Sequence, residues 1–229
     1  MRQGAVRKAT PKAVTLGRAP KQLRSRESFE RVIQAATAIL RETGHADFTL
    51  SEVSRRSRAS IGSIYGRVES KEELVRVVQH RVFEQVDREF AEVVNKIRRR
   101  SLPLRQLVPI LVRDLAEMLR SYGNIFSAMI ETSAHDPQVA ATGKRHYAEQ
   151  ALDFKLLLLE RRSEIAHPDP EHAATFAFAL VYGMIARHLG FGTRDAAGEG
   201  DWRQLVDDLG TTCLALLLTD PGDQRPTAR

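Results

Sequence analysis

Hydrophobic residues recur along this chain at spacings of three and four positions, which is the period of an amphipathic helix. No stretch alternates hydrophobic and polar residues for long enough to predict a strand. The first amphipathic segment ends at Gly44, a residue type favoured just after a helix. Its hydrophobic face consists of Phe29, Val32, Ile33, Ala36, Ile39 and Leu40. The pattern predicts an all-α protein.

Helix-capping residues mark where several of these helices begin. Ser70 and Glu73 form a capping box, in which each side chain can accept a hydrogen bond from a free amide. Asp136 and Asp169 each precede a proline, an order that suits a cap followed by the first helical residue. Asp201 is placed to cap the last helix. About nine helices are predicted, near residues 27–43, 50–57, 61–67, 71–97, 103–119, 124–133, 137–159, 170–189 and 202–218.

The distribution of charge divides the chain into segments. Residues 1–26 carry eight Lys or Arg and no acidic residue, whereas the whole chain of 229 residues has a net charge of +6. We expect residues 1–26 to be a flexible basic arm of the kind that follows phosphates or enters a minor groove. A solvated terminus without a partner would have the same composition. Residues 27–73 and 74–219 are predicted as two helical units, and residues 220–229 as a frayed tail.

Composition and motifs argue against several classes of protein. The N-terminal segment lacks the apolar stretch of a secretory signal, and residues 176–186 are too few to cross a bilayer, which needs ~20 residues. We therefore expect a soluble cytoplasmic protein. Cys213 is the single cysteine, the histidines are scattered, and no GxSxG, HExxH or phosphate-binding loop occurs. No enzyme activity, cofactor or metal site is predicted, although Cys213 could respond to oxidants.

Residues 49–74 contain the pattern of a helix-turn-helix. Such a motif needs a short helix with an apolar inner face, a tight turn, and a second helix free to enter the major groove of DNA. Leu50, Val53 and Ser57 share one face of the first short helix. The predicted turn is Arg58-Ala59, Ser60 caps the second helix, and Ile64 and Val68 point inward at four-residue spacing.

The remaining residues of the second short helix are free to face outward. Ser60 and Ser63 offer short hydrogen-bonding groups, Gly62 allows close approach of the backbone, and the Tyr65 hydroxyl can reach a phosphate. Four arginines and no acidic residue occur between positions 55 and 67, so this segment attracts the DNA backbone. Two short packed helices without a DNA-binding role are the plainer interpretation.

Residues 26–80 resemble the DNA-binding domain of the TetR family of bacterial repressors. The resemblance consists of the opening helix ending at Gly44, Phe48-Thr49, the run Ser60–Tyr65 and the run Ser70–Leu74. It implies that Thr49, Ser60, Gly62, Ser63, Tyr65 and Lys71 lie at the DNA surface. It also implies that the later helices bind a ligand and form a homodimer.

The segment departs from the family pattern at several positions. Arg58 stands where glycine is usual, and a left-handed conformation there would cost roughly 1 kcal/mol. Ile61 replaces a common lysine and suits a thymine methyl group, whereas Arg67 replaces an aromatic residue and can reach a phosphate. Ser54 and Ser57 replace alanines, which we expect to weaken packing slightly. The predicted DNA-binding set is Thr49, Arg56, Arg58, Ser60, Ile61, Gly62, Ser63, Tyr65, Arg67 and Lys71.

The last two predicted helices are the candidates for a dimer interface. Residues 173–189 are apolar almost all round, so this helix must be buried on two faces. The final helix has one apolar stripe. In the TetR family these two helices pair with their symmetry mates in a four-helix interface. The resemblance therefore assigns to the interface Leu180, Met184, His188, Leu209, Cys213 and Leu217.

Bulky side chains on the helices that should surround the family's pocket are the candidate ligand contacts. They are Met118, Tyr122, Phe126, Met129, Tyr147, Phe154 and Tyr182. Such linings suit an apolar or aromatic ligand, although the plainer interpretation is that most of these residues belong to the ordinary core. The predicted function is a repressor that such a ligand releases from a near-palindromic operator. A ligand-independent dimeric DNA-binding module, or a helical enzyme or carrier, remains open.

Overall fold

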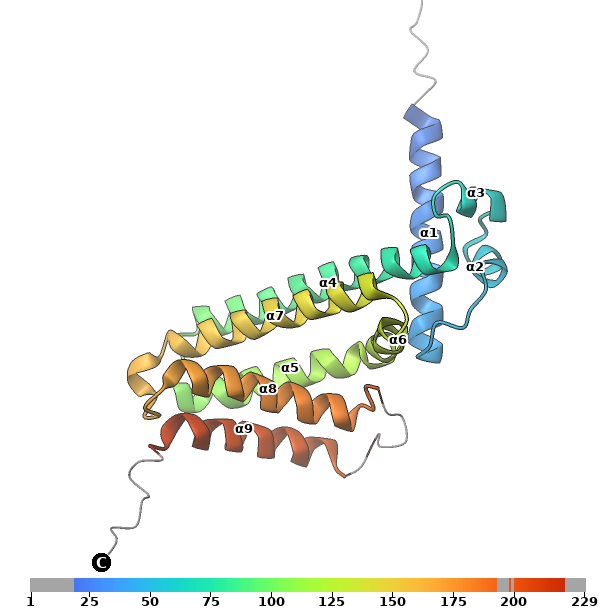
Figure 1. Ribbon diagram of the computed structural model, residues 1–229. Helices are drawn as coiled ribbons and strands as arrows, with labels where there is room; N and C mark the ends of the chain where they lie inside the picture. The colour runs from blue at the N-terminus through green and yellow to red at the C-terminus, as the bar shows by residue number, and fades with distance from the viewer. Residues whose placement is uncertain (1–18, 193–197, 199, 221–229) are drawn as a thin grey trace, which may run out of the picture.

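The computed structural model describes residues 19–192, 198 and 200–220, and this part of the chain is all helical (Figure 1). The first three helices form a small unit at one end, and the other six form an elongated bundle. A single 3-10 turn, Arg162–Glu164, precedes α8. The α-helices are α1 (Ala19–Thr43), α2 (Leu50–Ser57), α3 (Ile61–Tyr65), α4 (Lys71–Arg99), α5 (Leu104–Ser121), α6 (Gly123–Ser133), α7 (Pro137–Leu159), α8 (Pro170–His188) and α9 (Trp202–Leu218).

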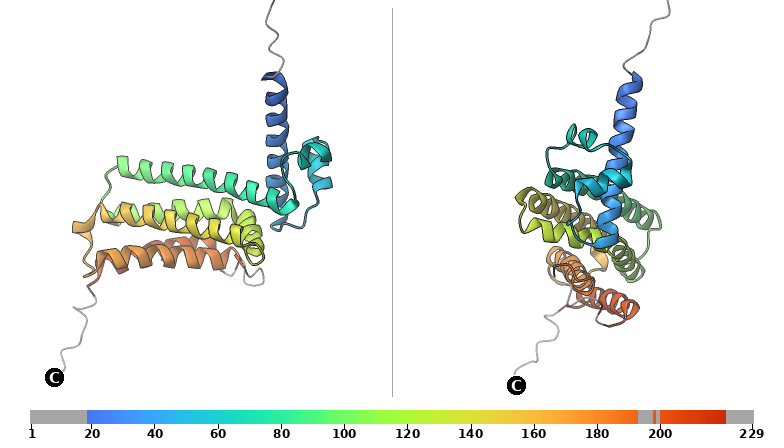
Figure 2. Two further views of the ribbon diagram at one scale, coloured as in Figure 1. Left: turned by 45° about the horizontal axis from the view of Figure 1, so that its top comes forward. Right: turned by 90° about the vertical axis from the view of Figure 1, so that its right-hand side faces the viewer.

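The helices α1, α2 and α3 form a small unit that rests on the beginning of α4 (Figures 1 and 2). Ile39 and Leu40 of α1, Val53 of α2 and Ile64 of α3 are all buried. Leu74 at the start of α4 completes this cluster and is fully buried as well. A unit of this size buries too little apolar surface to be stable alone, so α4 forms part of its core.

The larger bundle is arranged in layers around α5. The left view of Figure 2 shows α4 on one side, α5 and α7 in the middle, and α8 and α9 on the other side. Leu107, Leu111, Leu115 and Leu119 follow the length of α5 and are fully buried. The helix α6 lies at the end of this bundle nearest α1, where the Asn124 side-chain amide donates to the Arg41 carbonyl at 2.8 Å. The bundle and the small unit therefore meet at two places, α4 and α6.

The caps predicted from sequence are confirmed. Ser70 Oγ accepts from the Glu73 amide at 3.2 Å, and Glu73 Oε2 accepts from the Glu69 amide at 2.5 Å. Asp136, Asp169 and Asp201 cap α7, α8 and α9. These caps satisfy amides that have no partner within their own helix, which explains why the starts of these helices could be predicted from local sequence.

Two predicted boundaries are corrected. Residues 19–26, assigned to the flexible arm, are the first two turns of α1, because lysine, glutamine, leucine and arginine follow Pro20 and all favour a helix. The remaining arm, residues 1–18, and the tail residues 221–229 lie outside the described residues. The second short helix ends at Tyr65 rather than Arg67, since the chain turns at Gly66 to reach Ser70.

Half of the predicted dimer interface is also corrected. Leu209, Cys213 and Leu217 of α9 are buried within the chain, because this stripe of α9 packs against α5 and α8. The Cys213 thiol lies 3.8 Å from the Ala177 carbonyl oxygen of α8. Burial raises the pKa of Cys213 to about 12, so the thiol is protonated near neutral pH and poorly reactive.

Among the described residues, no helix is both long enough and apolar enough to cross a bilayer.

The position of Leu217 predicts a stability effect. Leu217 is fully buried and Leu156 is 47% exposed, although both are leucines in long helices of the bundle. Leu217→Ala should lower the free energy of unfolding by roughly 2–5 kcal/mol because it leaves a cavity, and Leu156→Ala by well under half of that. Denaturant unfolding at two protein concentrations measures both effects. Equal losses, or a loss for Leu217→Ala that disappears at high concentration, would contradict the assignment of Leu217 to the core.

Candidate nucleic-acid interface and ligand cavity

The two short helices α2 and α3 are each fixed at their first residue by a side-chain cap. Thr49 Oγ1 accepts from the Glu52 amide at 3.2 Å, and Ser60 Oγ accepts from the Ser63 amide at 3.1 Å. Both capping residues are exposed. The capping role of Ser60 predicted from sequence is confirmed. The two helix N-termini therefore lie at the surface of the small unit, where their remaining amides can meet an anion.

The turn between α2 and α3 has the left-handed residue that the motif requires. Arg58 has φ 54° and ψ 29°, a region where a side chain costs energy. Ser54 Oγ donates to the Ala59 carbonyl at 2.6 Å, and the Ala59 amide donates to Ser57 Oγ at 3.3 Å. The hydroxyls of both serines thus bond to the backbone of the turn, a role that alanines at these positions could not perform.

The face of α3 that points away from the core is the one predicted. Ile64 is fully buried, whereas Ile61 is 38% and Tyr65 is 55% exposed. Gly62 and Ser63 are exposed between them, and a Cβ added at Gly62 would meet no atom within 4 Å. The apolar Ile61 and the half-apolar Tyr65 thus lie on an open surface that no other described part of the chain covers.

Several cations that sequence analysis assigned to DNA are bonded within the chain. Arg56 lies 2.6 Å from Glu42 and 3.1 Å from Glu52, and the hydrogen bond to Glu42 raises the pKa of Arg56 above its usual value. Arg67 donates to Ser25 Oγ at 2.7 Å and lies over the Phe29 ring. Lys71 is half-buried.

These bonds fix the small unit internally. Lys71 Nζ donates to the Ala46 carbonyl at 3.0 Å, and the Arg31 guanidinium donates to the Ser57 carbonyl at 3.3 Å. Arg56, Arg58 and Arg67 are all exposed, but Arg58 differs from the other two because no bond of its side chain to another described residue is found. Among the predicted cations, Arg58 is therefore the one whose charge is directed to solvent.

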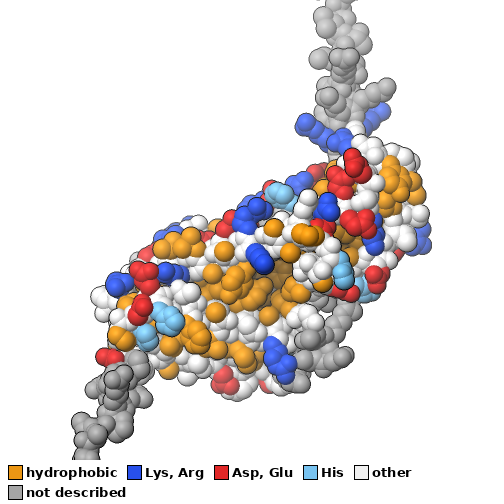
Figure 3. Space-filling view, in the orientation of Figure 1, with side chains coloured by type: hydrophobic (Ala, Val, Ile, Leu, Met, Phe, Trp, Pro, Cys, Tyr) orange, Lys and Arg blue, Asp and Glu red, His pale blue; other side chains and the backbone are white. Residues whose placement is uncertain are grey.

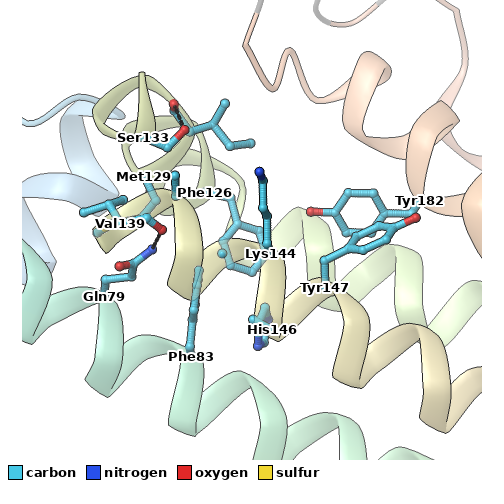
Figure 4. A pocket seen from close by; sticks show the side chains of 13 residues that line it. Gln79, Phe83, Phe126, Met129, Ser133, Val139, Lys144, His146, Tyr147 and Tyr182 are labelled. Atoms are coloured by element: carbon cyan, nitrogen blue, oxygen red, sulfur yellow. Dashed lines mark hydrogen bonds between the residues drawn. The ribbon is translucent and has the colours of Figure 1, made fainter. Parts of the chain in front are cut away.

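A cavity of about 420 Å³ opens between α4, α6, α7 and α8 (Figure 4). Phe83 and Phe126 contribute rings to its wall, and Tyr147 and Tyr182 meet edge to face at one side. In Figure 3, hydrophobic side chains gather on the face of the molecule formed by α7 and α8. The lining residues are Gln79, Phe83, Phe126, Met129, Ile130, Ser133, Val139, Ala140, Gly143, Lys144, His146, Tyr147 and Tyr182.

The structure brings four of the predicted ligand residues to this cavity, namely Phe126, Met129, Tyr147 and Tyr182. The others lie elsewhere. Phe154 is fully buried and packs on Phe178, with ring centroids 5.4 Å apart. The Tyr122 hydroxyl donates to Glu89 at 2.8 Å, and burial together with that carboxylate raises the pKa of Tyr122 to about 12. Met118 is a buried residue of α5.

Sequence analysis missed the contribution of α4 to the cavity. Phe83 and Gln79 belong to α4 and line the wall opposite Lys144 and Tyr147 of α7. Phe83 is a buried aromatic residue one position away from the main stripe of α4, which includes Val82. An apolar residue beside the main stripe is a signal in the sequence that α4 contributes to a second site, because such a residue must pack against a second neighbour of the same helix.

His146 of α7 adds a neutral polar group to the wall. Its ring stacks on Phe83, with centroids 4.2 Å apart, and burial lowers the pKa of His146 to about 4. Its Nδ1 lies 2.6 Å from Asp87 Oδ1, close but poorly aligned for a hydrogen bond. Burial raises the pKa of Asp87 to about 6, and Glu149 and Asp153 add to this rise. The imidazole is therefore uncharged near neutral pH.

Two polar contacts join the beginning of α4 to α7 beside the cavity. Arg76 Nε lies 2.8 Å from Asp136 Oδ2, and Gln79 Nε2 donates to the Val139 carbonyl at 3.0 Å. Burial would raise the pKa of Asp136, but hydrogen bonds from Arg76 and from the amides of Val139 and Gln138 hold it below its usual value. Val139 and Gln79 also line the cavity. The same two residues therefore form part of the cavity wall and part of the contact that positions α4 against α7.

Among the described residues, no group of His, Cys, Asp and Glu side chains is arranged to hold a metal ion.

Comparison with known proteins gives matches in fold but not in sequence. No family model matches the chain, and no curated protein matches it. A TetR-family regulator from Mesorhizobium loti, described as putative, superposes with a TM-score of 0.70 at 20% identity, covering 85% of this chain and 96% of that one. A transcriptional regulator from Cytophaga hutchinsonii gives 0.64 at 17% identity, covering 83% and 98%.

A third solved structure is the fatty acid degradation regulator FadR from Bacillus halodurans, with a TM-score of 0.60 at 15% identity, covering 82% of this chain and 94% of that one. These proteins match over nearly their whole length. The chain therefore has the all-helical fold of the TetR-family transcriptional regulators, and the resemblance found in residues 26–80 is confirmed at the level of fold.

The strained turn predicts a stabilising substitution. Arg58→Gly should raise the free energy of unfolding by about 1 kcal/mol, because glycine adopts a positive φ without steric cost. Arg58→Ala keeps the β-carbon and should give no such gain, which makes it the matched control. Thermal or denaturant unfolding of the three proteins measures the difference. A glycine variant that is less stable than the alanine variant would show that the Arg58 side chain itself stabilises the turn.

Proposed function

We propose that this chain is a dimeric transcriptional repressor that binds operator DNA through α3 and releases it when a small molecule enters the cavity. The observation that supports this most directly is the outer face of α3. Its exposed residues, Ile61, Gly62, Ser63 and Tyr65, take no part in the core of the small unit. Their exposure at the end of a capped helix is what insertion into a major groove requires.

Each residue on this face has a distinct proposed role. Ile61 contacts a thymine methyl group, Gly62 lets the backbone approach the base edges, and Ser63 offers a hydroxyl to a base or phosphate. Tyr65 donates to a phosphate, and Arg58 adds a charge to the backbone contact. Thr49 and Ser60 bring the N-termini of α2 and α3 to adjacent phosphates. Arg56, Arg67 and Lys71 contribute mainly by holding these elements in place, because their side chains already have partners.

The surface that supports a homodimer is the outer face of α8. Phe176 is 50% exposed and Met184 is 42% exposed, although both are large apolar residues. Gly183 lies next to Met184, and a Cβ added there would meet no atom within 4 Å, so a second helix could approach closely. Leu180 and His188 are half-buried on the same helix. In this proposal a second copy packs on the outer face of α8, and the α9 residues that were predicted from sequence take no part in the interface.

The proposed ligand response follows from the continuity between the cavity and α4. A ligand can release DNA only if it binds more tightly to an arrangement in which the two copies of α3 are wrongly spaced. Gln79 and Phe83 form one wall of the cavity, and Leu74, which completes the core of the small unit, lies on the same helix five residues before Gln79 and nine before Phe83. A ligand that separates α4 from α7 would therefore move the small unit. The cavity favours this function over a ligand-independent DNA-binding module.

The experiment that tests the proposal is selection of genomic DNA. Purified protein is mixed with sheared DNA from the source organism at near-physiological salt, and the bound fragments are sequenced. Enrichment of a few near-palindromic sites supports a dimeric regulator, because two copies of α3 related by a two-fold axis read two half-sites. Uniform recovery that is lost steeply with salt would mean backbone attraction alone and would contradict the proposal.

The open space at Gly62 provides the variant for this experiment. Gly62→Leu should fold normally, since leucine suits a helix and its Cβ would meet no neighbouring atom within 4 Å, but its side chain keeps α3 away from the base edges. We expect site-specific binding to weaken at least about tenfold, the loss of one to two base contacts. Gln85→Leu places the same side chain on an exposed position of α4 and should bind as the unmodified protein does. Equal binding by both variants would exclude α3 as the reading helix.

The contact between α4 and α7 predicts a loss of operator affinity without any change at the DNA surface. Arg76→Met combined with Gln79→Met removes both bonds to α7, so the DNA-binding position of α4 is less populated. We expect operator affinity to fall by about fivefold or more, the lower range of allosteric coupling. Arg98→Met is the control, because it removes an ion pair to Glu160 at the other end of α4. Fluorescence anisotropy with a selected operator measures both, and equal losses would contradict the proposed coupling.

A further inference from the structure

The only charge that the described side chains bring to the wall of the cavity is positive. Among the described residues that line it, Lys144 is a cation and none is Asp or Glu. His146 is neutral near pH 7, because burial lowers its pKa to about 4. An apolar wall beside a charge strengthens the field of that charge relative to bulk water. The cavity therefore favours an anion over a cation of the same shape.

The lysine is available to a ligand. Lys155, on the same helix, lies 3.0 Å from Glu171, whereas no ion pair joins Lys144 to another described residue. Figure 4 shows the Lys144 side chain extending along the open side of the cavity. The hydroxyl of Tyr182 points to that same side, and burial raises the pKa of Tyr182 to about 12. The hydroxyl therefore keeps its proton near neutral pH and can donate a hydrogen bond.

The opposite side of the cavity is mostly apolar, although Gln79, Ser133 and the neutral His146 ring also line it. Phe83 and Phe126 meet edge to face there, with ring centroids 5.9 Å apart, and Met129 and Val139 lie beside them. Each of these four residues is buried. On this side Gln79 donates to the Val139 carbonyl, and the Ser133 hydroxyl donates to the Ile130 carbonyl, so both carbonyls are occupied. One end of the cavity thus offers donors and the other offers hydrocarbon and ring surface.

We propose that the ligand of this cavity is an apolar monocarboxylate, with its carboxylate at Lys144 and Tyr182 and its hydrocarbon or ring body against Phe83 and Phe126. One lysine and one hydroxyl match a single negative charge with two acceptor oxygens. A phosphate monoester carries nearly two charges and is usually held by arginines, none of which is among the described residues that line this cavity. The inference rests on the ligand-binding role in the proposed function and specifies the chemistry of that ligand.

The test compares carboxylic acids with their uncharged amides in the absence of DNA. The probes are octanoate, 4-phenylbutyrate and 1-naphthoate, each paired with its primary amide, and the readouts are thermal stabilisation and isothermal titration calorimetry. A ligand that binds the folded protein raises its apparent stability in proportion to the logarithm of its concentration. We expect at least one acid to bind about tenfold more tightly than its amide, which corresponds to about 1.4 kcal/mol.

Two lysine variants test whether Lys144 causes the preference for acid over amide. Lys144→Met keeps the length of the side chain and should abolish the difference between acid and amide, leaving the affinity for the amide unchanged. Lys96→Met, on an exposed position of α4 outside the cavity, should keep the full preference. The preference should also weaken as salt is raised, because Lys144 is exposed to solvent.

Three outcomes would overturn the inference. They are equal affinity for acid and amide, an unchanged preference in Lys144→Met, and no stabilisation by any of the acids up to about 1 mM, the weak end of the affinity scale. Because no DNA is present, these results are independent of the genomic selection. Failure to recover specific sites would contradict the proposed function while the carboxylate preference stood, and recovered sites without a preference would contradict this inference alone.

Discussion

The structure depends on the burial of α4 by two different partners. Its first turns complete the core of the small unit, where Leu74 is fully buried, and its middle packs on α5 and α7 around Val86 and Phe90. Neither partner can be removed without exposing a face of this helix. Because α1, α2 and α3 have too little apolar surface to fold alone, their position is set by their packing on α4 and by the contact of α1 with α6. The geometry of the outer face of α3 is therefore a property of the whole bundle.

The small unit separates residues that hold its shape from residues that are free to bind. Ser54 and Ser57 bond to the backbone of the turn, and Arg56 and Arg67 are bonded to α1 or to its neighbours. These contacts offset the cost of the left-handed Arg58. The side chains on the outer face of α3 make no comparable contacts. Exposed residues outside the core can be substituted with little loss of stability, which suits the proposed role of this face in recognising one DNA sequence among many.

The parts of the molecule that local sequence specifies were predicted well. The caps at Ser60, Ser70 and Asp136 act on amides two or three residues away, so their effect can be recognised without knowledge of the fold. The inner position of Ile64 follows from its four-residue spacing to Val68. The same local signals explain why the family resemblance in residues 26–80 was visible in the sequence and then confirmed in the fold.

The partner of a buried face could not be predicted in the same way. An apolar stripe such as that of Leu209, Cys213 and Leu217 shows that a helix is covered on one side, but α5 of the same chain and a second copy would leave the same pattern. Phe154 and Tyr147 are both aromatic residues of α7, yet one is core and the other lines the cavity. That difference depends on where α8 crosses α7, which is a tertiary property and has no local signal.

The arrangement of polar and apolar groups in the cavity gives the proposed response a direction. Lys144 and Tyr182 belong to α7 and α8, whose contact with each other is among the most extensive in the bundle, whereas Phe83 belongs to α4. A ligand whose charged end is held on α7 and α8 would place its apolar body against α4 and the bonds made by Arg76 and Gln79. The helix that carries the small unit is then the one that must yield. An uncharged ligand, free to bind in several orientations, would lack this bias and would move α4 less for the same binding energy.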